Sequence, residues 1–173
     1  MRVLLIGPSG AGKTRLAARL AAALGTRAQD LDQLVEAAAG RAIPQIFRAE
    51  GEPGFRTRER AALLAVAAEP GVLATGAGVV LDPENRALLR ASGTVVFLSA
   101  TPNTQRARLV GAAPRPLLAN ASDPLARLTE LYAARLPLYR EIAHHELATD
   151  GRTPPALVAA LIGLLRSPAA AAR

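Results

Sequence analysis

The segment from Gly7 to Thr14 constrains this chain more than any other feature. It reads Gly-Pro-Ser-Gly-Ala-Gly-Lys-Thr and matches G-x-x-x-x-G-K-[ST], a phosphate-binding loop, at every fixed position. Glycines let such a loop turn tightly and bring its backbone N–H groups against phosphate oxygens. An apolar strand expected over 2–6 and a helix expected over 14–24 complete the strand, loop and helix order that the motif requires.

The choice of cation inside this loop supports the same interpretation. The chain has 21 Lys and Arg residues, and Lys13 is the only lysine among them. A compact ammonium on a thin stem suits a phosphate oxygen, so Lys13 is predicted to reach the outer phosphates of a nucleotide. The Thr14 hydroxyl is predicted to bind Mg²⁺. The alternative is a glycine-rich turn that binds no ligand. We interpret the segment as a nucleoside-triphosphate site.

Composition narrows the remaining possibilities. Half of the 173 residues are hydrophobic and only 3% are aromatic, which favours helices packed on a sheet over a β-sandwich. There is no cysteine, which excludes disulfides, a thiol nucleophile and cysteine-based metal sites. The arginines behind the net charge of +7 are scattered, so we do not expect a nucleic-acid partner. With no apolar run long enough for a bilayer and no signal peptide, we expect a cytoplasmic protein without a membrane partner.

The order of expected elements predicts an α/β fold. Strands alternate with helices, which implies a five-stranded parallel sheet with helices on both faces, a three-layer α/β/α arrangement. The strands are expected over 2–6, 26–29, 72–75, 94–98 and 146–149, and the main helices over 14–24, 31–39, 55–67, 83–90, 102–110, from 124 and 156–165. Pro137 is expected to kink or divide the helix that begins near 124. We expect one domain over 1–173, with a helical substrate-binding insertion at about 31–60, a mobile lid at about 109–123 and a frayed tail at 167–173.

Two carboxylates follow the second expected strand. Asp30 and Asp32 are two residues apart, so in an extended segment they share a face and can point at one spot. One could hold Mg²⁺ through water while the other accepts a proton from an attacking hydroxyl. The alternative is a helix N-cap, for which a single Asp suffices. We favour the functional interpretation.

Beyond the phosphate loop, the chain resembles the shikimate kinase family from Val3 to about Leu165. The resemblance rests on motifs in a fixed order: Asp30-x-Asp32, Gly51-Glu52-x-x-Phe55-Arg56-x-x-Glu59, Gly76-Ala77-Gly78, Arg115-Pro116-Leu117-Leu118 and Arg135-x-Pro137-Leu138-Tyr139. It implies ATP- and Mg²⁺-dependent phosphorylation of the 3-hydroxyl of shikimate, in aromatic amino-acid biosynthesis. It also implies a nucleoside-monophosphate-kinase-like fold and a monomer.

Matching positions carry the family's functional residues onto this sequence. Asp32 would hold the shikimate hydroxyls and act as, or position, the base, and Asp30 would sit behind Mg²⁺ and Thr14. Arg56 and Arg135 would bind the substrate carboxylate, a task suited to the forked donors of guanidinium. Arg115 would close with the lid onto the transferring phosphoryl group. Substrate contacts are also expected at Gly76, Ala77 and Gly78, and nucleotide contacts at Gly10, Ala11, Gly12, Lys13, Thr14, Arg15, Arg108, Arg115, Arg152 and Pro154.

One position departs from the family pattern. The family motif has three consecutive glycines after the third strand, and here the middle residue is Ala77. If this position requires a positive φ, alanine adds strain of the order of 1 kcal/mol. A methyl group there could also crowd the substrate.

Two other functions remain open on the sequence alone. A P-loop kinase for another small hydroxylated acid, such as gluconate, would keep the ATP site but has less use for both Arg56 and Arg135. A non-catalytic ligand-sensing domain would not need Lys13, Asp32 and Arg115 together.

Overall fold

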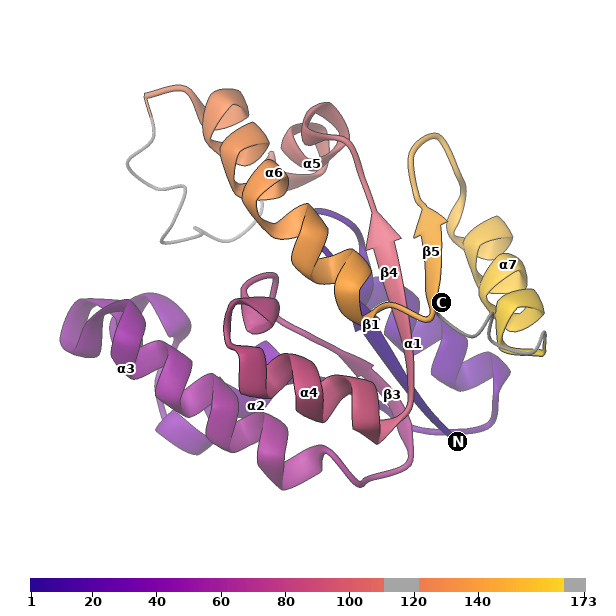
Figure 1. Ribbon diagram of the computed structural model, residues 1–173, viewed down its shortest axis with the longest axis horizontal. Helices are drawn as coiled ribbons and strands as arrows, with labels where there is room; N and C mark the ends of the chain where they lie inside the picture. Colours follow the sequence, from indigo (N-terminus) through magenta and orange to yellow (C-terminus); the bar gives the residue numbers. More distant parts are fainter. Residues whose placement is uncertain (111–121, 167–173) are drawn as a thin grey trace.

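A parallel sheet forms the centre of the molecule. The computed structural model describes residues 1–110 and 122–166 (Figure 1). Its strands are β1 (Arg2–Ile6), β2 (Ala28–Asp30), β3 (Gly71–Ala74), β4 (Thr94–Ser99) and β5 (His145–Ala148). They lie in the order β2-β3-β1-β4-β5, and every neighbouring pair is parallel. The predicted fold class is confirmed, with strand boundaries shifted by at most two residues.

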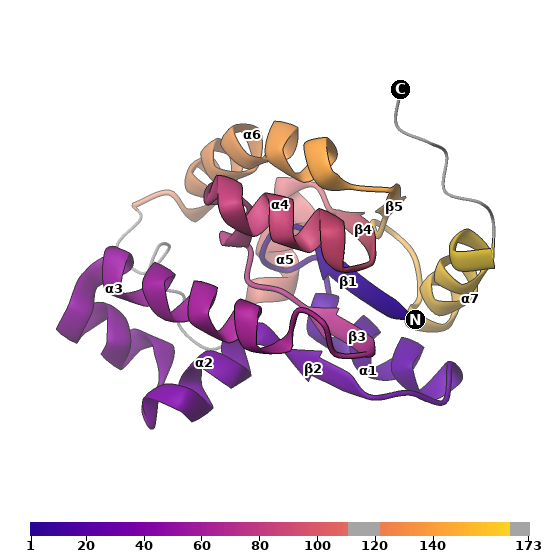
Figure 2. The same cartoon turned by 60° about the horizontal axis from the view of Figure 1, so that its bottom comes forward.

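Alternating side chains of the central strands build two separate cores. Val3 and Leu5 of β1 belong to one core, and Leu4 and Ile6 belong to the other. Successive side chains of a strand point to opposite faces, so an entirely apolar strand must be covered on both. Helices α1 (Lys13–Ala23) and α7 (Pro154–Arg166) cover the first face, and α4 (Pro83–Ser92) and α6 (Pro124–Ile142) cover the second (Figure 2). The result is the expected three-layer arrangement.

Two helices between β2 and β3 project beyond these layers. They are α2 (Leu31–Ala39) and α3 (Ile43–Val66), which carry a small core of their own around Val35, Ile46 and Phe55. Within α3, Gly51 has non-helical backbone angles (φ 68°, ψ −175°), and Pro53 follows it. The sequence predicted a helix over 55–67, and Gly51 interrupts α3 shortly before that range.

Helix caps follow the sequence closely, but one proline does not act as predicted. The Asp82 carboxylate accepts from the backbone N–H groups of Glu84 and Asn85 and begins α4, which follows the 3₁₀ turn η1 (Val79–Leu81). Helix α5 (Pro102–Leu109) begins at the Thr101 cap. Pro137 was expected to kink or divide its helix, and α6 is continuous through it, so the helix is not divided. Its apolar face spans the proline, with Tyr132 before it and Tyr139 after it packed on one core, and this packing holds the helix together.

Among the helices of residues 1–110 and 122–166, none is long and apolar enough to cross a membrane.

Candidate active site

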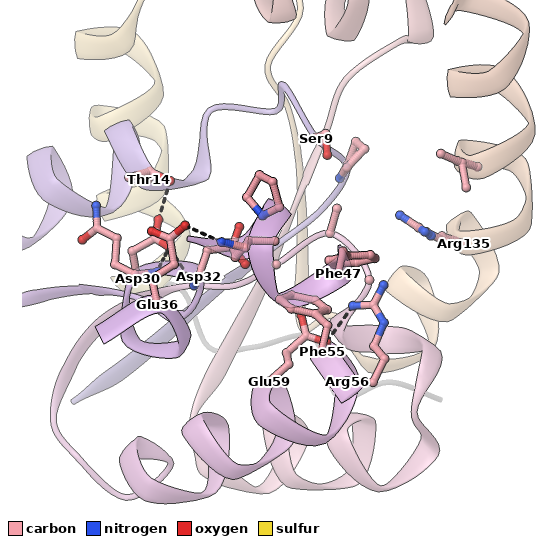
Figure 3. A pocket seen from close by; sticks show the side chains of 18 of the residues that line it. Ser9, Thr14, Asp30, Asp32, Glu36, Phe47, Phe55, Arg56, Glu59 and Arg135 are labelled. Atoms are coloured by element: carbon pink, nitrogen blue, oxygen red, sulfur yellow. Dashed lines mark hydrogen bonds and ion pairs between the residues drawn. The ribbon is translucent and has the colours of Figure 1, made fainter. Parts of the chain in front are cut away.

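A cavity of about 490 Å³ opens at the carboxyl ends of the central strands. Parallel sheets place their ligand sites at this edge. Its walls come from the phosphate loop, α2, α3, the turn after β3, α5 and α6 (Figure 3). The lining residues are Pro8, Ser9, Thr14, Asp30, Asp32, Gln33, Glu36, Ala42, Ile43, Pro44, Phe47, Phe55, Arg56, Glu59, Gly76, Ala77, Gly78, Gln105, Leu128, Leu131, Tyr132, Arg135 and Tyr139.

The phosphate loop has the backbone that its glycines predict. Gly7, Gly10 and Gly12 all have positive φ, at 142°, 79° and 90°, where other residues are strained. The Lys13 ammonium donates to the carbonyl oxygens of Gly7 at 2.8 Å and Pro8 at 2.9 Å, so it lies folded over the loop. Gly12 caps α1 without a side chain, which leaves the helix N-terminus open to an anion.

Asp30 and Asp32 line the same cavity, but the reason given from the sequence is wrong. Asp30 ends β2, whereas Asp32 is the second residue of α2, so the two do not share one extended segment. The Asp30 carboxylate accepts from the Thr14 hydroxyl at 2.5 Å and from the Asp32 backbone N–H at 2.9 Å. The Asp30 carboxylate therefore caps α2 and also contacts Thr14, so the helix cap and the position beside the phosphate loop, which the sequence analysis treated as alternatives, occur together. The helix then turns the Asp32 side chain into the cavity (Figure 3).

The donors at this end of the cavity fit a magnesium ion that arrives with a nucleotide. Within the part of the chain that the structure describes, no group of three or more His, Cys, Asp or Glu could hold a metal ion. Mg²⁺ in phosphoryl-transfer sites is bound through one or two carboxylates together with substrate phosphates. The Thr14 hydroxyl and the Asp30 carboxylate are hard oxygen donors beside the phosphate loop. They suit that arrangement.

Arg56 approaches the cavity from α3, held by two carboxylates. Its Nη1 donates to Glu59 at 2.7 Å, and its Nη2 donates to Glu52 at 2.8 Å. Burial of the guanidinium lowers the pKa of Arg56, but these two ion pairs outweigh that effect and the pKa is raised overall. The guanidinium lies so close to Gly78 that a Cβ atom there would be 2.6 Å from its Cζ. Gly78 therefore has to be a glycine for Arg56 to lie there.

Glu59 is a functional candidate that the sequence analysis left without a role. Only 1% of its surface is exposed, and its Oε1 is buried without a hydrogen-bond partner. Burial raises the pKa of Glu59, and the charge of Arg56 opposes that rise. Its spacing of three from Arg56 on one helix was the available signal. The Glu59 carboxylate orients the Arg56 guanidinium through the ion pair between them.

Arg135 enters the cavity from a second helix, α6. It is 8% exposed, on α6, and points into the same space as Arg56 (Figure 3). Figure 3 places both arginines away from the end occupied by Thr14 and Asp30. The cavity thus has a cationic end and an end that faces the phosphate loop.

The turn after β3 closes the cavity at its base. A Cβ atom at Gly76 would lie 2.5 Å from Glu59 Oε1 and 2.9 Å from Asp32 Oδ1, so a side chain here would displace both carboxylates. No residue other than glycine within 1–110 and 122–166 has a positive φ, and Ala77 is therefore unstrained. The strain considered for Ala77 does not arise.

Four of the residues expected to contact the nucleotide lie outside this cavity. Arg108 of α5 donates to the Gly10 carbonyl at 3.1 Å and to the Thr149 hydroxyl at 2.9 Å. Arg152 follows β5, and Pro154 begins α7. Arg15 is exposed on the first turn of α1. None of these four lines the cavity. Arg115, most of the expected lid and the tail at 167–173 lie outside the described residues.

Comparison with known proteins agrees with the geometry. A family model described as shikimate kinase matches residues 9–166. A shikimate kinase of Neisseria meningitidis serogroup C is 52% identical over 143 residues, which cover 82% of this chain and 84% of that protein. A shikimate kinase of Symbiobacterium thermophilum is 46% identical, with 96% of this chain and 97% of that protein covered.

Solved structures give the same result. A shikimate kinase from Acinetobacter baumannii in complex with shikimate has a TM-score of 0.91 and 38% identity, covering 95% of this chain and 92% of that one. A deoxyadenosine kinase from M. mycoides with bound dATP has a TM-score of 0.62, 12% identity and coverage of 96% and 100%, a likeness that shows the fold alone. By the match to its family model and by these relatives, the chain belongs to the shikimate kinase family.

Proposed function

We propose that this chain transfers the γ-phosphoryl group of ATP to the 3-hydroxyl of shikimate, giving shikimate 3-phosphate and ADP in aromatic amino-acid biosynthesis. The carrying observation is one cavity with two arginines, Arg56 and Arg135, on one side and the phosphate loop with Thr14 on the other. An acid with a carboxylate and a ring hydroxyl fits between two such ends. Its carboxylate would meet the guanidinium groups while its hydroxyl faces the phosphate loop.

In this proposal each side chain of the site has a defined task. The Asp32 carboxylate holds the attacking hydroxyl and takes its proton. Lys13 leaves the carbonyls of Gly7 and Pro8 and donates to the outer phosphates. Arg115 stabilises the charge on the transferring group. Thr14 and Asp30 hold Mg²⁺, which neutralises phosphate charge when bound.

The remaining contacts are assigned by position. The backbone of Gly10, Ala11 and Gly12 receives the phosphates, together with Arg15 at the start of α1. Arg108, Arg152 and Pro154 flank the adenine. Gly76, Ala77 and Gly78 contact the substrate ring from the base of the cavity. We further propose that residues 31–60 act as the substrate-binding insertion of a single domain and residues 109–123 as its lid.

We also propose a cytoplasmic monomer that needs neither nucleic acid nor membrane. Analytical ultracentrifugation at enzyme-assay concentration tests this, and a dimer that dissociates with loss of activity would contradict it.

A coupled ADP-release assay with shikimate and gluconate side by side tests the reaction. Turnover with shikimate and not with gluconate is expected, because two arginines that meet at one end of the cavity suit a carboxylate held by a rigid ring. Turnover with gluconate alone would assign the chain another substrate. Binding of shikimate without ADP release would indicate a sensing role.

A further inference from the structure

Tyr139 is a completely buried phenol in the wall of the cavity. It lies on α6 one turn after Arg135, with 0% of its surface exposed. Its ring stacks on Phe97 of β4, with centroids 5.0 Å apart and planes at 19°. Burial raises the pKa of Tyr139, against a smaller opposing effect of Arg135, so the hydroxyl remains a donor at ordinary pH. Packing alone would be served by phenylalanine, and the hydroxyl therefore requires its own explanation.

That hydroxyl fixes the middle of the turn after β3. It donates to the Ala77 carbonyl at 2.5 Å, across 62 positions of sequence. The carbonyls on either side, of Gly76 and Gly78, accept from N–H groups of η1 instead. Residues 1–110 and 122–166 contain no cis peptide, so the Gly78 N–H points opposite to the Ala77 carbonyl. By holding that carbonyl, Tyr139 sets the direction of the Gly78 N–H.

The same hydroxyl is coupled to Arg135. The positive charge of Arg135 acts on the Tyr139 phenol, one helical turn away on the same face of α6. Both residues line the cavity, as does Gly78. One buried oxygen atom thus contacts the turn at the base of the cavity and faces an arginine of its cationic end.

We propose that Tyr139 is a positioning residue for the substrate carboxylate, which aligns Arg135 and the Ala77–Gly78 peptide through one hydroxyl. This inference rests on the proposed function, because it takes a carboxylate at the cationic end as the group recognised. It makes Tyr139 a determinant of specificity for the acid, beyond its part in the core.

The test compares two ligands that differ only in that group: shikimate, and the alcohol in which hydroxymethyl replaces its carboxylate. Their dissociation constants are measured by calorimetry for wild type, Tyr139→Phe and Thr75→Val. Tyr139→Phe keeps the stack on Phe97. It should raise the dissociation constant of shikimate about tenfold and that of the alcohol less than about twofold. Thr75→Val is the matched control, since its buried hydroxyl also donates to a backbone carbonyl, that of Leu5 at 3.1 Å, and Thr75 does not line the cavity. It should leave the acid-to-alcohol ratio unchanged.

Equal weakening of both ligands by Tyr139→Phe would overturn the inference, because a purely structural role predicts that result. Failure of the proposed function looks different: wild type would then not prefer shikimate to the alcohol. If Tyr139→Phe does not fold, 3-fluorotyrosine, which keeps the shape and alters donor strength, is placed at position 139 in a Tyr132→Phe background, since Tyr132 also lines the cavity. The acid-to-alcohol ratio should then shift from the value of Tyr132→Phe alone, and an unchanged ratio overturns the inference.

Discussion

Two backbone carbonyls hold the Lys13 ammonium in this structure, those of Gly7 and Pro8. The shape of the loop itself comes from glycines at positive φ, and those glycines do not depend on the lysine. Lys13→Ala should therefore abolish turnover while circular dichroism and the thermal midpoint stay near wild type. Retention of more than about a tenth of kcat would contradict the assignment, since that loses less than about 1.4 kcal/mol of barrier lowering.

Asp32 lies on α2, whereas Asp30, the carboxylate proposed to hold Mg²⁺, ends β2. Asp32→Asn keeps the volume and removes the negative charge, so it should lower kcat by about 10²–10⁴-fold, the usual size of a general-base contribution. Affinity for Mg·ATP should change little. Steady-state kinetics with either substrate varied measures both effects. A variant with weakened Mg·ATP binding and unchanged kcat would exchange the roles of Asp30 and Asp32.

Ala77 adopts backbone angles that any residue can adopt. Ala77→Gly should therefore change KM for shikimate by less than about tenfold, which corresponds to less than about 1.4 kcal/mol of binding. A larger improvement in KM would mean that the methyl group obstructs the substrate.

At the scale of elements, the turn after β3 and helix α3 depend on each other through Gly78. A methyl group at Gly78 would displace the Arg56 guanidinium, so Gly78→Ala should raise KM for shikimate by at least about tenfold. Gly163→Ala on α7 is the control, because a Cβ atom there meets nothing within 4 Å. It should leave KM unchanged and stabilise the helix by up to about 1 kcal/mol. Equal KM values for the two variants would remove Arg56 from substrate binding.

His144 lies directly before β5 and beside β4, and its protonation is linked to folding. His144 Nδ1 accepts from the Val95 N–H at 3.0 Å, which requires the ring nitrogen to be unprotonated. Burial lowers the pKa of His144, and the charges of Arg90 and His145 add to that effect. Its contribution to stability is complete above the unfolded pKa near 6.5 and is lost as pH falls through that value towards the lower folded pKa.

The free energy of unfolding should accordingly fall as the pH is lowered through about 6.5. Urea titrations of wild type and His144→Asn measure it, because asparagine keeps an acceptor that does not titrate. The variant should show the smaller pH dependence. If the free energy of unfolding depends on pH equally in both proteins, His144 is not the cause of that dependence.

Short-range patterns predicted much of the elements and part of the site. The phosphate loop consists of eight consecutive residues. The ion pair between Arg56 and Glu59 joins residues three apart, which lie on the same face of a helix. Contacts between distant segments were out of reach: Tyr139 with Ala77 across 62 residues, and Arg108 with Gly10 across 98. The backbone around Asp32 was misjudged, because the strand ends at Asp30 and the helix begins at once, a change of backbone that the Asp30 carboxylate brings about by capping.

For the whole molecule, ligand binding and stability are linked. Helix α1 packs in one core, while its N-terminus forms part of the phosphate loop. Mg·ADP at about 100 times its Kd should stabilise the folded state by about 2.7 kcal/mol. For a chain of this size that raises the midpoint by about 5–10 °C in a thermal scan. Lys13→Ala should lose most of this rise, and a full rise in that variant would place the nucleotide elsewhere.

The single lysine has a practical consequence for chemistry on the intact protein. Reagents that acylate lysine side chains have one target in this sequence, the Nζ of Lys13, which is 9% exposed and hydrogen-bonded to the loop. The labelling rate of Lys13, compared with that of a reference peptide added at known concentration, therefore reports by mass spectrometry whether the phosphate loop is occupied.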